Sequence, residues 1–145
     1  MEESRVESWI EISTYLARLK HALNNGATIS FQRFRKVDDE RDERYTNDYT
    51  MNALFPDEDP KEVLRRELLT LTVGDYLRTV KDHRYPNRSD MREFGKVYNG
   101  TDEVYIKIRV ELYDKSGFGQ HTTFVMSFHF AEKPFSEETF PYRSK

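Results

Sequence analysis

The 145-residue sequence contains no cysteine. This absence excludes a disulfide framework, a thiolate metal site and a cysteine nucleophile, which leaves oxygen and nitrogen groups for any chemistry. No apolar run approaches the roughly 18 residues that span a bilayer, and the acidic N-terminus MEESRVESWI lacks the apolar region of a signal peptide. We therefore expect a cytoplasmic protein with no membrane partner.

Positive charge is also in the minority, because 23 Lys and Arg residues face 26 Asp and Glu residues and leave a net charge of −3. A chain of this charge is not an obvious nucleic-acid-binding protein. The distribution is uneven, however: acids dominate residues 38–62, and residues 78–109 carry a modest basic excess. That basic region is a candidate binding surface, with an ordinary solvated surface as the equal alternative.

Apolar and aromatic side chains are sufficient for one folded domain. Hydrophobic residues make up 37% of the chain, and ten Phe, nine Tyr and one Trp argue against disorder. A length of 145 residues suits one core and is short for two domains. We expect a single domain over residues 1–145.

Helix signals begin near the N-terminus. Ser8 and Glu11 have the spacing of a capping box, and apolar residues then recur at helical intervals until Asn24-Asn25-Gly26, which is a helix stop signal. These residues predict the first helix.

Two further helices are predicted in the middle of the chain. Asp59 and Pro60 have the character of an N-cap and a first helical residue. Thr72 and Asp75 again have capping-box spacing. The short helix that they predict should carry Tyr76, Leu77 and Val80.

The second half of the chain alternates with the period of a β-strand. Residues 92–98, 103–113 and 122–130 form three such runs, and Asn-Gly between the first two is a strong hairpin signal. Residues 28–34 form a shorter strand or extended segment, and residues 81–90 and 114–121 have the composition of loops. The pattern predicts an α+β fold with an antiparallel sheet and helices packed on one face.

Two segments stand outside this pattern. Residues 37–58 are dense in charge and are interpreted as an exposed loop or insertion, whose deletion should leave folding intact. Residues 136–145 are interpreted as a polar C-terminal tail.

The alternation assigns side chains to opposite faces of the sheet. The core face of the middle strand carries Val104, Ile106, Ile108 and Val110. If the last strand is its antiparallel neighbour, the same core receives Phe124, Met126, Phe128 and Phe130. The opposite face then receives Tyr105, Lys107, Arg109, Val125, Ser127 and His129. On this non-core face, substitution of His129 should cost little stability.

The polar face has the residue types that a phosphodiester requires. Lysine and arginine hold phosphate oxygens, tyrosine stacks on a base or donates a hydrogen bond, and a histidine with a pKa near roughly 6.5 transfers protons at neutral pH. A solvated sheet face often shows the same alternation of Tyr, Lys and Arg. The spacing alone divides about evenly between the two interpretations.

The sequence resembles the MqsR family of type II toxin–antitoxin toxins over roughly residues 65–135. The resemblance is carried by LLTLT at 68–72 before Asp75-Tyr76, FGK at 94–96, YIK at 105–107 and SFHFAE at 127–132. It implies a RelE-like α+β domain that cleaves messenger RNA and is neutralised by a cognate antitoxin. A glutamine implicated in some members falls on Gly95 here, so its role is absent or is taken by Lys96.

The resemblance and the polar face together lead to a hypothesis of catalysis. Attack by the ribose 2′-OH would cleave mRNA without a metal or other cofactor. The catalytic candidates are His129 for proton transfer, Lys107 and Arg78 for the charge on phosphorus, and Tyr105 for positioning the nucleotide. The substrate-binding candidates are Lys96, Arg109 and Ser127. A non-catalytic RelE-like interaction module is the alternative, and the oligomeric state stays open, with a homo-oligomer among the choices.

Overall fold

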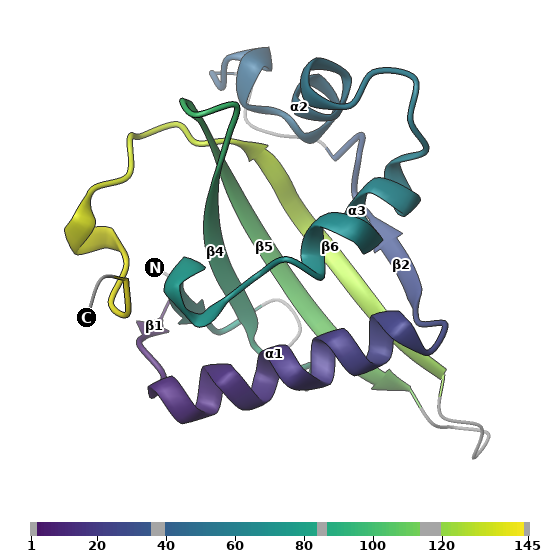
Figure 1. Cartoon of the computed structure of the whole chain (residues 1–145), viewed down its shortest axis with the longest axis vertical. Coiled ribbons are helices and arrows are strands. Elements are labelled where there is room, and N and C mark those ends of the chain that lie inside the picture. Colours follow the sequence, from purple (N-terminus) through teal and green to yellow (C-terminus); the bar gives the residue numbers. More distant parts are fainter. Residues whose placement is uncertain (1–2, 36–39, 84–86, 114–119, 144–145) are drawn as a thin grey trace.

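Six β-strands form one mixed sheet in the spatial order β1-β3-β4-β5-β6-β2 (Figure 1). The computed structural model describes residues 3–35, 40–83, 87–113 and 120–143. Residues 114–119 of the loop predicted at 114–121 lie outside this part of the chain, and residues 120 and 121 belong to the last strand. The strands are β1 (Ser4–Arg5), β2 (Thr28–Phe31), β3 (Tyr76–Val80), β4 (Met91–Tyr98), β5 (Asp102–Tyr113) and β6 (Gln120–Phe130). The α+β class is therefore confirmed.

Helices α1 (Trp9–Asn24) and α3 (Pro60–Leu68) cover one face of this sheet (Figure 1). The predicted capping box forms at α1, where the Glu11 amide donates to Ser8 Oγ at 3.1 Å and the Ser8 amide donates to Glu11 Oε1 at 3.0 Å. Asp59 caps α3 as predicted. No helix in the described ranges is both long and apolar enough to cross a bilayer.

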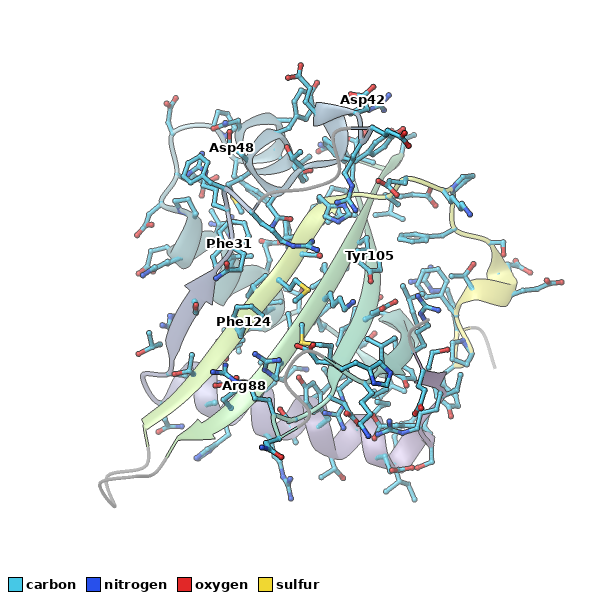
Figure 2. The ribbon with its side chains drawn as sticks, turned by 180° about the vertical axis from the view of Figure 1, so that it is seen from behind. Phe31, Asp42, Asp48, Arg88, Tyr105 and Phe124 are labelled. Carbon is cyan, nitrogen blue, oxygen red and sulfur yellow. The ribbon has the colours of Figure 1, made fainter. Side chains whose placement is uncertain are left out.

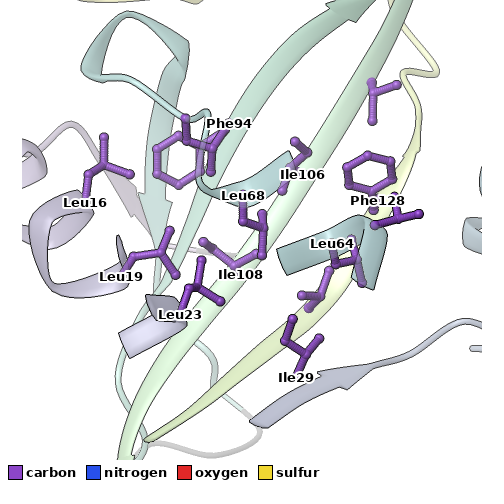
Figure 3. Close-up of a cluster of buried hydrophobic side chains, with 14 of the residues drawn as sticks. Leu16, Leu19, Leu23, Ile29, Leu64, Leu68, Phe94, Ile106, Ile108 and Phe128 are labelled. Carbon is purple, nitrogen blue, oxygen red and sulfur yellow. The ribbon is translucent and has the colours of Figure 1, made fainter. Parts of the chain in front are cut away.

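The core lies between the helices and the sheet (Figure 3). It contains Leu16, Leu19 and Leu23 of α1, Leu64 and Leu68 of α3, and sheet residues Ile29, Phe94, Ile106, Ile108 and Phe128. The side of β5 that was predicted to face the core does so, since Val104, Ile106 and Ile108 are all buried. The alternation on β5 was a reliable guide because β5 itself contains no extra residue that would exchange its faces.

Residues 76–80 form β3 and not the predicted helix. The capping-box residues Thr72 and Asp75 close only a single 3₁₀ turn, Val73–Asp75, before the chain extends. Tyr76 then packs its ring against Phe94 with centroids 5.9 Å apart. Pairing with β1 and β4 supplies the hydrogen bonds that a helix would otherwise have made.

The segment 37–58 is not the predicted loop in its described part. It contains a 3₁₀ turn at Glu43–Tyr45 and helix α2 (Asn47–Leu54), which Thr46 caps. Asn47, Thr50 and Met51 are buried on one side of α2. Two of these three buried side chains are polar. The spacing of apolar residues therefore does not show the helical period, and the sequence did not predict this helix.

Helix α2 completes the edge of β6, which β2 pairs only in part. Strand β2 runs parallel to β6 up to Phe31, opposite Val125, so the predicted all-antiparallel sheet is wrong at this edge. Beyond that point the Phe128 amide donates to Asn47 Oδ1 at 2.9 Å, and Asn47 Nδ2 donates to the Met126 carbonyl at 2.9 Å. The Phe130 amide donates to Thr50 Oγ1 at 2.8 Å.

A β-bulge in β6 corrects the predicted faces of that strand. Lys107 pairs with Ser127, but Ile108 pairs with Val125, so Met126 is an extra residue. Val125 consequently faces the helices, whereas Phe124 and Met126 pack in a second cluster with Val80 and Met91. The list of predicted core residues was therefore wrong for Phe124, Met126 and Val125.

The C-terminal segment packs on the domain as far as it is described. Phe140 is buried, the Tyr142 hydroxyl donates to the Glu7 carbonyl at 2.6 Å, and Arg143 lies 3.2 Å from Asp75. The predicted polar tail is thus held by aromatic as well as charged contacts.

Replacing Asn47 with alanine tests the role of α2 as the cover of β6. The change leaves the buried Phe128 amide and Met126 carbonyl without their partner, so the free energy of unfolding should fall by about 2 to 3 kcal/mol. Urea unfolding measures this. Asn52→Ala is the matched control, because Asn52 lies on the exposed side of the same helix and should cost within about 0.5 kcal/mol. A loss of less than about 0.5 kcal/mol for Asn47→Ala would contradict the role of α2 as the cover of β6.

Candidate active-site cleft

The strand register aligns four polar side chains across the face of the sheet opposite α1 and α3. Arg78 of β3 pairs with Glu93 of β4, Glu93 pairs with Lys107 of β5, and Lys107 pairs with Ser127 of β6. Directly paired residues point to the same face of a sheet. These four residues are called the first row.

A second row lies two residues further along the same strands. It consists of Gly95, Tyr105 and His129, which pair directly across β4, β5 and β6. The rings of Tyr105 and His129 are 5.4 Å apart between centroids. A Cβ atom at Gly95 would lie 2.8 Å from the ring of Phe135. The C-terminal segment therefore occupies the space that a larger side chain at position 95 would need.

The two rows form the floor of a cleft of about 670 Å³. Figure 2 views this face of the sheet, where Tyr105 lies nearer to Asp42 than Phe124 does. Tyr105 lines the cleft, and Phe124 does not line it. Five basic side chains line the cleft, Arg35, Arg41, Arg78, Lys107 and Lys133, against two acidic ones, Glu93 and Glu132. The cleft of this acidic chain is thus predominantly positive. It contains five of the seven predicted site residues: Arg78, Tyr105, Lys107, Ser127 and His129.

Glu93 organises the cations of the first row and was not predicted from the sequence. Its side chain is buried, and Arg78 Nε donates to Glu93 Oε1 at 2.9 Å. The second oxygen, Oε2, lies 3.8 Å from Lys107 Nζ. One buried carboxylate therefore faces two of the predicted catalytic cations. The Asn99-Gly100 turn was a signal that could have found it. In this hairpin Tyr98 pairs with Asp102, which leaves a loop of three residues, and counting back five residues on each strand from that pair places Glu93 opposite Lys107.

The ring of His129 contacts the backbone of the next residue, Phe130. Its Nδ1 lies 2.9 Å from the Phe130 carbonyl oxygen. Because a carbonyl oxygen only accepts, this contact is a hydrogen bond only when Nδ1 carries the proton. In the neutral ring Nε2 then keeps its lone pair. His129 is consequently oriented as a base through Nε2.

Burial changes the protonation of His129. The residue is only 6% exposed, and this burial is the main reason that its pKa lies below the ordinary value. The hydrogen bond to the Phe130 carbonyl acts in the opposite direction, and the charge of Arg41 lowers the pKa further. The neutral form is therefore favoured at neutral pH. The expectation that substitution of His129 costs little stability assumed an exposed side chain, and the burial of the ring contradicts that assumption.

Two predicted substrate-binding residues lie outside the cleft. Lys96 Nζ donates to Thr70 Oγ1 at 2.7 Å, at the end of α3, because its position in β4 faces the helices. Arg109 is 2% exposed and is held by Glu111 at 2.8 Å and Asp82 at 3.2 Å. The structure therefore does not bring these two residues together with the other five, and their substrate-binding roles stay predictions. Arg109 lies on the predicted face of β5, but alternation does not reveal the ion pairs that bury it or the contact that Lys96 makes with Thr70.

Arg35 and Arg41 line the cleft but were assigned to a loop or its border. They precede α2, and Arg41 Nε lies 2.9 Å from Glu132 Oε1, just after β6. The sequence contains no signal for this contact, because residues 41 and 132 are joined only by the packing of α2 on β6.

The comparisons with known proteins do not identify a family. No family model matches the chain, no curated protein matches it, and no solved structure matches it. Within the described residues, no three His, Asp or Glu side chains lie close enough to share a metal ion.

Replacing Glu93 with glutamine tests whether its charge organises the first row. The change leaves Lys107 and Arg78 close together without the carboxylate, so the free energy of unfolding should fall by about 1 to 3 kcal/mol. Urea unfolding at neutral pH measures the loss. Glu137→Gln removes a charge from an exposed position and should have an effect within about 0.5 kcal/mol. A Glu93 variant as stable as this control would mean that the carboxylate is not needed to hold the two cations.

The lowered pKa of His129 predicts how the stability of the protein depends on pH. Between that pKa and the unfolded value of about 6.5, the unfolded chain binds more protons, so stability falls as the pH decreases. The free energy of unfolding should therefore fall more for the wild type than for His129→Gln between about pH 7.5 and pH 5.5. Parallel losses in the two proteins would show that His129 is not disfavoured as a cation.

Proposed function

We propose that the protein is an endoribonuclease that cleaves RNA by attack of a ribose 2′-OH on the adjacent phosphorus. The observation that carries this proposal is the position of His129, whose Nδ1 lies 2.9 Å from the Phe130 carbonyl oxygen, in a cleft lined by five basic side chains. A base beside clustered cations matches the needs of this reaction, in which a proton leaves the nucleophile and negative charge develops on phosphate oxygens.

The step balances without a metal, because the substrate itself contains the nucleophile. The 2′-OH proton passes to Nε2 of His129, and the 2′-oxygen forms its bond to phosphorus. The bond from phosphorus to the 5′-oxygen then breaks, and the leaving oxygen takes a proton from water. The hydroxide formed from that water takes the proton from Nε2 of His129, which returns to its starting state. The products are a 2′,3′-cyclic phosphate and a 5′-OH.

The first row supports this chemistry through charge. Lys107 and Arg78 stabilise the phosphorane, and Glu93 keeps both cations on the same part of the cleft floor. Tyr105, which lies against His129, offers a ring on which a base can stack. Ser127 pairs with Lys107 and adds a hydroxyl to the floor of the cleft.

We extend the proposal to a toxin of the MqsR type that acts on mRNA and is neutralised by an antitoxin protein. Support comes from the sequence resemblance, from the α+β layout with helices on one face, and from a cleft that gathers Arg78, Tyr105 and His129. Lys96 does not replace the family glutamine in this proposal, because it binds Thr70 behind the sheet.

A protein-interaction module without catalysis is the second candidate. Trp9 is 54% exposed and Ile10 is 72% exposed at the start of α1, and Val6 precedes them with a similar exposure. These side chains are neighbours in the chain at the N-terminal end of α1, and exposed apolar residues are available for contact with another protein. This surface lies on the helix side of the molecule, away from the cleft, so a partner there is compatible with either candidate.

Cleavage of a labelled single-stranded RNA tests the catalytic proposal. Wild-type protein should cut the RNA in the presence of EDTA and leave cyclic phosphate ends. His129→Gln should lower the single-turnover rate by roughly 10²- to 10⁴-fold, the usual contribution of an acid–base group. Melting temperatures of both proteins establish that the variant is folded.

The matched control is Arg18→Ala, which removes a charge from the exposed side of α1 and should leave the rate unchanged. RNA that stays intact with folded wild-type protein would contradict the enzyme and favour the interaction module. A folded His129 variant with the wild-type rate would contradict the assigned base.

A further inference from the structure

Arg41 lies on the opposite side of the second row from Arg78 and has the same kind of support. Arg78 Nε is held at 2.9 Å by Glu93, and Arg41 Nε is held at 2.9 Å by Glu132. The anchor at Nε fixes the plane of the Arg41 guanidinium and does not itself engage the two terminal nitrogens of Arg41. The two arginines thus resemble each other in how their side chains are fixed.

One terminal nitrogen of Arg41 has no acceptor among the described residues. Nη1 is buried and makes no hydrogen bond, although Arg41 lines the cleft. A buried donor without a partner is rare in folded proteins, because an unmade hydrogen bond is costly. Nη1 of Arg41 is thus an unmet donor at the rim of the cleft, and water or a phosphate oxygen that reaches the guanidinium can supply its acceptor.

The place of Arg41 indicates which acceptor it would meet. Arg78 and Lys107 come from β3 and β5, whereas Arg41 comes from the chain before α2, beyond β6. His129, on β6, lies between these two groups, and the charge of Arg41 acts on its ring. Figure 2 places Asp42, the neighbour of Arg41, at the end of the sheet beyond Tyr105. A chain that crosses the strands at His129 would meet one basic group on either side.

We propose that Arg41 binds the phosphate next to the scissile one, so that the cleft holds two consecutive phosphodiesters of a single-stranded RNA. This inference rests on the proposed ribonuclease function. Arg78 and Lys107 receive the scissile phosphate, and the guanidinium of Arg41 receives its neighbour. Glu132 opposes an anion there, but its side chain is 48% exposed and water screens it.

Single-stranded RNA is the substrate class that this geometry fits. Lys107 and His129 lie on the floor of the cleft and are largely buried. A base-paired strand keeps its bases stacked and cannot lower one nucleotide to that floor, whereas an unpaired strand can splay its bases outward. The requirement for two adjacent phosphates also favours an internal linkage over a terminal nucleotide.

Binding of an uncleavable RNA tests Arg41 independently of catalysis. The probe is a fluorescent, mixed-sequence, single-stranded 10-mer with 2′-O-methyl groups, titrated with the full chain at several salt concentrations. Arg41→Ala should weaken binding about tenfold, and the slope of log affinity against log salt should fall by about 0.7, the value for one contact to a single strand. Arg41→Lys should restore the slope and only part of the affinity, because lysine keeps the positive charge but cannot donate two parallel hydrogen bonds to a phosphate as a guanidinium does. Arg18→Ala should change neither quantity.

A second measurement identifies the phosphate. Neutral methylphosphonate linkages are placed one at a time along the oligonucleotide sequence at which wild-type protein cleaves, with the scissile 2′-OH removed. One linkage next to the scissile position should weaken binding to the wild type about tenfold and to Arg41→Ala by less than about twofold. The melting temperature of each variant confirms folding.

The outcomes separate the inference from the proposed function. Wild-type affinity and slope in Arg41→Ala, or equal losses at every linkage, would overturn the phosphate subsite. RNA that binds through Arg41 but is never cleaved overturns the ribonuclease and leaves the subsite supported by the salt dependence. Wild-type protein that binds no RNA overturns both.

Discussion

The cleft depends on how the edge of β6 that β2 leaves unpaired is satisfied. Strand β2 pairs with β6 only to Phe31, and the remaining backbone groups of β6 must find other partners or stay unsatisfied in a buried setting. Side chains of α2 meet that need, since Asn47 and Thr50 bond to the Met126, Phe128 and Phe130 backbone. These bonds fix α2 beside the strand that carries His129. They also bring the segment before α2, with Arg41, to the rim of the cleft.

Charge is arranged around the same strands in an unusual way for an acidic chain. A net charge of −3 leaves the molecule as a whole unattractive to nucleic acid, yet the cleft gathers five basic side chains against two acidic ones. Glu93 makes this possible, because a buried carboxylate compensates Arg78 and Lys107 where they approach each other. Local charge, and not net charge, therefore decides which ligand the cleft suits.

Some features were open to prediction because they depend on neighbours in sequence. The capping box of Ser8 and Glu11, the start of α3 at Asp59 and the Asn99-Gly100 hairpin all formed as expected. The placement of Tyr105 beside His129 also followed, since two antiparallel strands with alternating faces bring such residues together. The family resemblance stays a prediction, because none of the comparisons tests it.

The sequence by itself determined the α+β class, the core face of β5 and the placement of Tyr105 and Lys107 on its opposite face, because periodicity is a property of consecutive residues. Tertiary structure decided the rest. Residues 76–80 became a strand because two neighbouring strands offered hydrogen bonds, and the bulge at Met126 exchanged the faces of Val125 and Phe124. Only packing across the fold could bury Arg109, turn Lys96 toward α3 and join Arg41 to Glu132. These contacts join residues that lie far apart in the chain. Patterns of neighbouring residues do not predict which distant pairs will meet or how much such a pair stabilises the fold.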